Sequence, residues 1–280
     1  MASAGEGSSA RGSSRHLTIF LIVINALLIL PFGYCVVVYP TQPPPAAERF
    51  QQALDDAMSP GAGNAATGLV ALTPGNSSLF WDRSDPQALK VLVAVWTDYS
   101  GYRDHFKGGC TLRREVWVTP VPQMQEACRG FGLSGAELNR RLEEYMGLAA
   151  GGTYSEVVEL WVSPDHVFRP CPDGEIDDAQ CNPGLPEVPS NPSADQLEHA
   201  RWFQRQVEKY YGERPLPWTR FGYTYDWADP AAKIGASEYI IRKDAAVFVS
   251  SVTPTGGYCS TQTTLSRSPA PAGTAFTAPC

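Results

Sequence analysis

The strictest alternation of hydrophobic and polar positions in the chain lies at residues 220–227. The aromatic side chains occupy one set of alternating positions and the remaining residues the other: Phe221, Tyr223, Tyr225 and Trp227 against Arg220, Gly222, Thr224 and Asp226. Side chains of a strand point alternately to two faces, so this pattern predicts a strand with an aromatic face and a polar face. We expect one face to be buried core and the other to face solvent or a site.

Other segments follow either this alternation or the spacing of three to four residues that is typical of a helix. Stretches rich in β-branched residues predict strands at 68–72, 90–96, 116–119, 157–162, 238–242 and 246–252, the last two as a hairpin. Apolar residues at helical spacing predict helices at 120–131, 134–146 and 193–211, and residues 46–58 are compatible with a shorter helix. The helix at 193–211 has the clearest start, because Ser193 and Gln196 form a capping pair.

Two predicted strands share a short sequence pattern. Residues 115–120 read EVWVTP and residues 159–164 read ELWVSP, with the first two of those helices between them. A separation of this kind suits a parallel pair of strands joined by a crossover. The alternative is that two strands share a common composition without being neighbours.

The N-terminal region contains one candidate membrane anchor. Residues 17–39 are 23 residues without a formal charge, and as a helix of about 34 Å they would cross a bilayer. Arg11 and Arg15 precede this run, and no charge follows it until Glu48, which predicts a cytoplasmic N-terminus. The rest of the chain is then expected outside the cytoplasm, on a single-pass protein of the plasma or inner membrane.

A cleaved signal peptide is the alternative to this anchor. Its apolar core would be residues 17–30, ended by Pro31. Three valines at 36–38 extend the apolar run, and no small-residue cleavage pattern follows at the right distance, so the anchor is favoured. Both interpretations export the domain.

The chain therefore divides into five predicted segments. They are a cytoplasmic tail at 1–16, the signal-anchor helix at 17–39, a Pro- and Gly-rich linker at 40–66, an α+β domain at 67–252 and a Ser/Thr/Pro-rich tail at 253–280. The domain is expected to hold a mixed sheet of about five to seven strands, covered on one face by helices. The tail is expected to be loosely ordered and held at most by cysteines.

The net negative charge of the chain disfavours nucleic acids and anionic lipid surfaces as partners of the domain. The formal net charge is −7, and no stripe of Lys and Arg is present beyond the anchor. An acidic domain of this kind repels phosphate backbones, so we expect no nucleic-acid binding. Contact with the membrane is expected from the N-terminal helix alone.

Six cysteines lie beyond the anchor, at 110, 128, 171, 181, 259 and 280. An even number outside the cytoplasm favours disulfides over free thiols. Their order suggests neighbouring pairs, which would be Cys110 with Cys128, Cys171 with Cys181, and Cys259 with Cys280. Other pairings remain open from the sequence.

The loop between Cys171 and Cys181 is acidic. It places Asp173, Glu175 and Asp177 at alternating positions, as a calcium loop does, but it lacks the glycine and the bidentate glutamate of an EF-hand. A solvated acidic loop without a cofactor is therefore the first interpretation, and a nonstandard calcium site is the alternative.

The strand at 220–227 carries the candidate ligand-binding residues, because flat aromatic surfaces bind sugars and quaternary amines. These residues are Trp218, Arg220, Tyr223, Thr224 and Tyr225. The alternative is that the aromatic side chains are core.

Asp226, together with Glu238 of the next strand, is a candidate pair for acid/base hydrolysis of a glycoside if one carboxyl stays protonated. The alternative is that both carboxylates pair with Arg220 and Arg242.

Two functions follow from these patterns. The first is a membrane-tethered, extracytoplasmic binding or interaction module for an unidentified ligand or protein partner. The second is an exported hydrolase that uses Asp226 and Glu238. They differ in whether these two carboxylates converge in a concave pocket.

Overall fold

The computed structural model describes residues 44–59, 61–229, 232–261, 267–269, 276 and 278–280. The predicted anchor at 17–39 lies outside these residues. No helix in the described ranges is both long and apolar enough to cross a membrane. The anchor therefore stays a prediction from the sequence.

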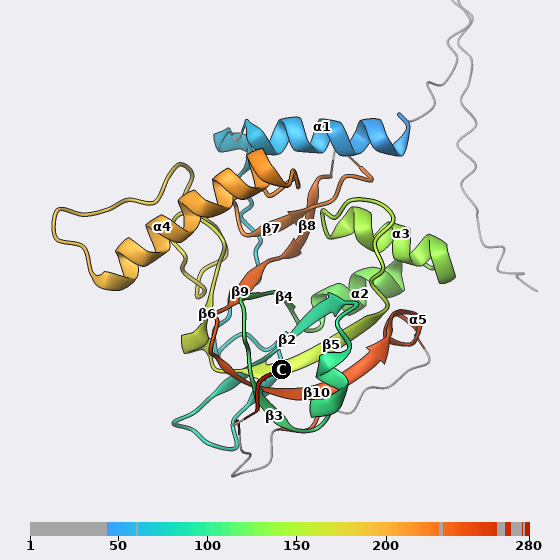
Figure 1. Ribbon diagram of the computed structural model, residues 1–280, viewed down its shortest axis with the longest axis vertical. Coiled ribbons are helices and arrows are strands. Elements are labelled where there is room, and N and C mark those ends of the chain that lie inside the picture. Colours follow the sequence, from blue (N-terminus) through green and yellow to red (C-terminus); the bar gives the residue numbers. More distant parts are fainter. Residues whose placement is uncertain (1–43, 60, 230–231, 262–266, 270–275, 277) are drawn as a thin grey trace, which may run out of the picture. The chain divides into compact units, whose positions relative to one another are not determined.

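The domain is α+β, with a large antiparallel sheet and several helices (Figure 1). The strands are β1 (Trp81–Asp82), β2 (Lys90–Thr97), β3 (Gly109–Thr111), β4 (Val116–Pro120), β5 (Glu156–Val162), β6 (Val167–Phe168), β7 (Tyr223–Tyr225), β8 (Ile234–Ser237), β9 (Tyr239–Ile241) and β10 (Ala246–Pro254). The helices are α1 (Ala46–Met58), α2 (Gln123–Gly130), α3 (Gly135–Tyr145), α4 (Ala194–Glu208) and α5 (Thr255–Tyr258). Short 3-10 turns occupy Ala62–Asn64, Ser100–His105 and Pro164–His166, and a π-helical turn at Lys209–Glu213 extends α4.

The main sheet has eight strands in the order β3-β10-β5-β2-β4-β9-β6, with β1 paired to β2. All pairings between these strands are antiparallel, so the predicted mixed sheet of five to seven strands is wrong in both respects. The predicted hairpin of 238–242 with 246–252 is also wrong. β9 pairs with β4 and β6, whereas β10 pairs with β3 and β5.

The two segments with a shared sequence pattern are not neighbours. They form β4 and β5, which pair with opposite edges of β2 and therefore run parallel to each other with β2 between them. β2 fits this central place because it is apolar on both faces: Val91, Leu92 and Val93 are all fully buried. The predicted direct pair is therefore wrong, although the relative direction of the two strands is as expected.

Helices cover one face of the sheet. Leu92 and Trp96 of β2 pack in one cluster with Met124 of α2 and Leu142 of α3. Further along the same face, Ile240 of β9 packs in a cluster with Trp202, Phe203 and other residues of α4. Side chains on the opposite face, including Val91 and Val93, pack against Leu72, Leu79 and Tyr102 from the connecting segments. The predicted strand at 68–72 is one of these connections, and it lies against the 171–181 loop through Leu69 and Leu72.

Strands β7 and β8 form a separate two-stranded ribbon beside α1 (Figure 1). Tyr225 and Trp227 pack against Ala53 and Ala57 of α1. The predicted polar face is also buried, since Thr224 and Asp226 are 4% and 5% exposed. The expectation of one buried and one open face is therefore wrong, because α1 covers one side of the ribbon and α3 the other.

Three disulfides connect the six cysteines. Cys171–Cys181 is confirmed, but the other two predicted pairs are wrong, since the structure joins Cys110 to Cys280 and Cys128 to Cys259. The prediction relied on proximity along the chain. Cys110 lies in β3 at the edge of the sheet, whereas Cys128 lies in α2, which packs on the face of the sheet that the helices cover. Three disulfides are typical of an oxidising compartment outside the cytoplasm.

The described part of the C-terminal tail is tied to the domain by more than cysteines. Arg267 forms an ion pair with the fully buried Glu159 at 2.8 Å, and the indole N–H of Trp161 donates to the carbonyl of Ser268 at 3.0 Å. Pro279 forms a bridge with Thr111 of β3. These described residues correct the expectation of a tail held at most by cysteines.

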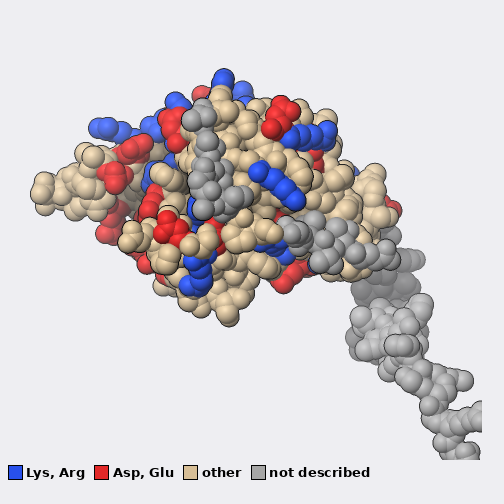
Figure 2. Space-filling model, turned by 90° about the horizontal axis from the view of Figure 1, so that it is seen from below, with Lys and Arg blue, Asp and Glu red and all other residues tan. Residues whose placement is uncertain are grey.

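Charged side chains are interspersed on the face of the molecule that Figure 2 shows. Lys and Arg lie beside Asp and Glu, and the described residues of this face form no continuous basic band. A basic band is what a phosphate backbone would need. The expectation that the chain does not bind nucleic acid remains a prediction from its charge.

Candidate functional site

A cavity opens where β2 and β4 separate. The two strands pair only at Val93 with Pro120 and at Ala94 with Thr119, whereas residues 116–118 of β4 pair with β9 along the other edge of β4 and do not pair with β2. The resulting space, which we call the β2–β4 cavity, has a volume of about 330 Å³. It is lined by residues 94–97 of β2, 115–119 around β4, 146–148 after α3, 216–218, 223–225 of β7, and Glu238. This volume lies within the range of small-molecule sites, roughly 300–1,000 Å³.

Aromatic rings form much of the cavity wall. At one end Trp117 stands perpendicular to Trp218, with ring centroids 6.4 Å apart, and to Tyr210, with centroids 5.7 Å apart. At the other end Trp96 packs on Tyr154 at 4.8 Å. Perpendicular rings present faces and edges to the same space, which suits a ligand with an apolar or cationic group.

Glu238 is the notable acid of this wall. It lies between β8 and β9, and the register of β9 on β4 places it opposite Thr119, one step beyond the pair Tyr239 and Val118. None of the ion pairs among the described residues includes Glu238. Its side chain keeps some accessible surface, but that surface faces the cavity. Burial therefore raises the pKa of Glu238 from 4.5 to about 8.

Two more polar atoms in the wall lack a hydrogen-bond partner among the described residues. They are the indole nitrogen of Trp218 and the hydroxyl of Thr119, in side chains that are 5% and 1% exposed. Buried polar groups in folded proteins nearly always have partners, so such atoms in a cavity wall are compatible with a ligand that supplies them. Glu238 and these two atoms make this end of the cavity the candidate site.

The raised pKa of Glu238 predicts a pH dependence of stability. The folded protein binds this proton more tightly than the unfolded chain, so the contribution is complete below about pH 4.5 and is lost as the pH rises through about 8. We expect Glu238→Gln to weaken the fall in stability between these pH values, because glutamine cannot ionise. Urea denaturation of the parent and the variant from pH 5 to pH 9 measures this. Parallel curves for the two proteins would show that Glu238 titrates normally.

The predicted catalytic pair is not brought together. Asp226 forms a bidentate ion pair with Arg141, at 2.9 and 2.6 Å, and does not line the cavity. Its amide bonds to Lys233 of the ribbon, whereas the amide of Glu238 bonds to Gly222, so the two acids lie about four residues or 13 Å apart along the strand. Neither acid forms an ion pair with Arg220 or Arg242 among the described residues.

Most of the predicted ligand-binding residues do meet at the cavity. Trp218, Tyr223, Thr224 and Tyr225 line it together with Glu238. Arg220 does not, because its guanidinium lies over the ring of Tyr211, 4.9 Å from the centroid.

β2 and β4 also form part of the cavity wall, above all through Trp96, Trp117 and Thr119. None of these three residues was among the predicted site residues. The sequence does show that Trp117 and Thr119 are two residues apart in the predicted strand at 116–119, so that their side chains share one face. No local signal showed that this strand would pair with β2 only at Thr119 and Pro120.

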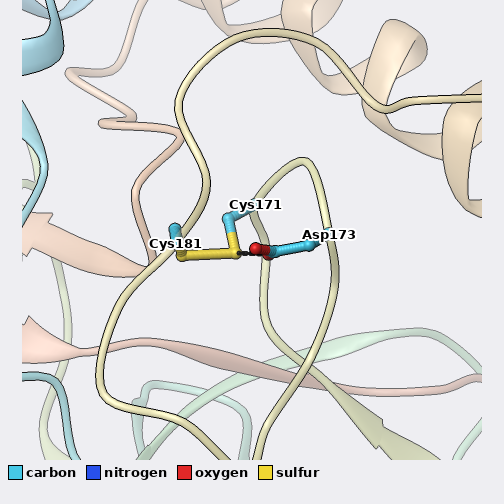
Figure 3. Close-up of side chains that lie close together, drawn as sticks. All are labelled: Cys171, Asp173 and Cys181. Carbon is cyan, nitrogen blue, oxygen red and sulfur yellow. Dashed lines mark hydrogen bonds between the residues drawn. A yellow bond between two sulfur atoms is a disulfide. The ribbon is translucent and has the colours of Figure 1, made fainter.

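The acidic loop does not gather the predicted calcium ligands. In the described ranges the only compact group of candidate metal ligands is Cys171, Asp173 and Cys181, and Figure 3 shows that the two cysteines form a disulfide. Disulfide sulfurs are not thiolate ligands. Glu175 and Asp177 do not join this group, and the pKa of Glu175 is raised by burial and by the nearby Asp173. The loop therefore offers no further support for the calcium alternative.

Comparison with known proteins finds no matching family model, no matching curated protein and no matching solved structure. An assignment of function therefore depends on the geometry and chemistry of the β2–β4 cavity.

Proposed function

We propose that this chain is a membrane-tethered binding protein whose domain lies outside the cytoplasm and binds a small, partly aromatic ligand in the β2–β4 cavity. The uncharged run at 17–39 and the arginines before it support the tether and its direction. The three disulfides support the oxidising side of the membrane.

The observation that carries the proposal is a partly buried acid in the wall of an aromatic cavity. A carboxyl group in such a wall is costly for the fold unless it has a partner. Glu238 has no ion-pair partner among the described residues, and Trp117 beside it keeps accessible surface that faces the cavity. A purely structural wall would place an apolar side chain at this position, so a ligand is the better explanation.

The test uses two small ligands of nearly identical shape. One is the 2-phenoxyethyltrimethylammonium cation and the other is its neutral carbon isostere, 3,3-dimethylbutyl phenyl ether. Binding to the full chain in lipid nanodiscs is measured by isothermal titration calorimetry. We expect at least one of them to bind with a stoichiometry of about one.

A matched pair of variants locates the binding site. Val95 lies on β2, lines the cavity from the face of the sheet opposite to Glu238 and is only partly buried, so Val95→Phe should fill space in the gap between β2 and β4 and weaken binding by about tenfold or more. Val188 is 49% exposed in a loop away from the cavity, so Val188→Phe should leave binding unchanged. Absence of binding by both ligands, or binding that Val95→Phe does not weaken, would refute the proposal.

A further inference from the structure

We infer that the ligand of the β2–β4 cavity carries an ammonium group, which the carboxylate of Glu238 pairs with while the ring of Trp117 packs against it. This inference rests on the proposed function and specifies the chemical class of the ligand.

Strand register places the two side chains on the same face. Glu238 lies opposite Thr119, and Trp117 is two residues from Thr119, so all three project from one face of the β4–β9 ladder. Diagonal neighbours of this kind lie about 7–8 Å apart, with their β-carbons somewhat closer. That gap is wide enough for an ammonium group between a carboxylate and an aromatic ring, and the perpendicular ring of Trp218 forms a second wall.

The chemistry of this corner favours a cation over a neutral or anionic group. The face of an aromatic ring carries negative charge density, so it attracts an ammonium group and repels a carbonyl or carboxylate oxygen. An anion would also meet Glu238. A neutral hydrogen-bond acceptor could pair with the protonated acid and with the indole N–H of Trp218, but it would gain nothing from the face of Trp117.

Other charges around the cavity do not take the place of such a ligand. Arg113 and Arg114 line the cavity but are exposed, and Glu115 accepts a hydrogen bond from the indole of Trp202 at 2.9 Å. Lys209 lies over the ring of Tyr210, 4.5 Å from its centroid.

Tyr210 and Tyr211 interact electrostatically with Glu238, and burial raises the pKa of both. Neither is therefore expected to ionise between pH 6 and pH 9. Glu238 is therefore the group that we expect to lose its proton when a cation binds.

Binding of a cation must then release a proton. At pH 7 the free site holds its proton on Glu238, and an ammonium group stabilises the carboxylate, so the proton leaves to the buffer. With a pKa of about 8 in the free protein, about 0.9 proton should be released per cation bound at pH 7. A neutral ligand should release none.

The experiment compares the same two isosteric ligands on the full chain in nanodiscs. We expect the cation to bind at least about tenfold more tightly than the neutral ether at pH 9, and by a smaller factor at pH 6, where the carboxyl must first lose its proton. Calorimetry at pH 7 in phosphate and in Tris, whose ionisation enthalpies differ, measures the proton released with each ligand.

Two charge-removing variants complete the design. Glu238→Gln should weaken the cation about tenfold or more, abolish proton release and change the affinity of the neutral ether by less than about threefold. Glu137→Gln makes the same change at an exposed site on α3 outside the cavity and should alter neither ligand.

Each other outcome overturns one defined claim. Equal affinities for both ligands, or tighter binding of the ether, would refute the cationic class while leaving the binding cavity in place. A cation that binds without proton release would refute the role of Glu238. If neither ligand binds, both the inference and the proposed function fail.

Discussion

Replacing Arg169 with methionine is expected to lower the free energy of unfolding by about 3–5 kcal/mol. Arg169 is wholly buried beneath the 171–181 loop. Its guanidinium donates to the carbonyls of Gln180 at 2.8 Å and Asp178 at 2.6 Å, and to the hydroxyl of Tyr239 at 2.9 Å, and it forms an ion pair with the Asp178 carboxylate. Methionine fills similar space but removes every one of these donors, from the loop carbonyls, from the Asp178 carboxylate and from the hydroxyl of the buried Tyr239.

Urea denaturation at pH 7 measures this loss, with the same substitution at Arg205 as the control. Arg205 is exposed on α4, so Arg205→Met should change stability by less than about 0.5 kcal/mol. A variant at Arg169 that unfolds within about 1 kcal/mol of the parent would show that the disulfide and the other contacts of the loop hold it without Arg169.

Elements with a strong local pattern could be predicted from the sequence. The helix at 46–58 has the predicted bounds, and α4 begins after Ser193 with the predicted capping box. β2 and β5 also lie where β-branched residues are dense. These elements follow from side-chain periodicity and capping, which neighbouring residues determine.

Pairings across long separations could not be predicted in the same way. Cys128 and Cys259 are 131 residues apart, and Cys110 and Cys280 are 170 apart, so no local pattern relates them. The burial of both faces of the ribbon depends similarly on α1, which precedes it by more than a hundred residues. Tertiary packing decides such features, and a single sequence does not reveal it.

The candidate site also combines features that a local pattern predicts with features that depend on long-range pairing. The density of aromatic residues at 218–227 suggested a binding region, and four of its predicted residues line the cavity with Glu238. The cavity itself arises because β4 pairs with β2 over only two residues at its C-terminal end, which is a property of strand register. The predicted pairing of Asp226 with Glu238 assumed that acids on adjacent strands lie side by side, but the register separates them.

Asp226→Asn is expected to destabilise the protein by about 3 kcal/mol or more and to leave ligand binding by the folded protein unchanged within about twofold. Asp226 is 5% exposed, and both of its oxygens accept hydrogen bonds from Arg141, whose side chain is 23% exposed. Asparagine keeps one acceptor oxygen but turns an amide donor toward the guanidinium. The partly buried arginine then loses its counter-charge, while the cavity is not touched.

A double-mutant cycle separates the ion pair from other roles of Asp226. Arg141→Met alone should leave the buried Asp226 carboxylate without a partner and cost about as much, whereas the two changes together should cost less than their sum by about 2–3 kcal/mol. Urea denaturation gives the stabilities, and calorimetry with the better of the two ligands gives the affinities. If Asp226→Asn unfolds like the parent but loses binding, Asp226 belongs to the site and the ion pair with Arg141 does not support the fold. If the two changes are additive, the carboxylate and the guanidinium act independently, and the stability of the ribbon comes from its aromatic packing against α1.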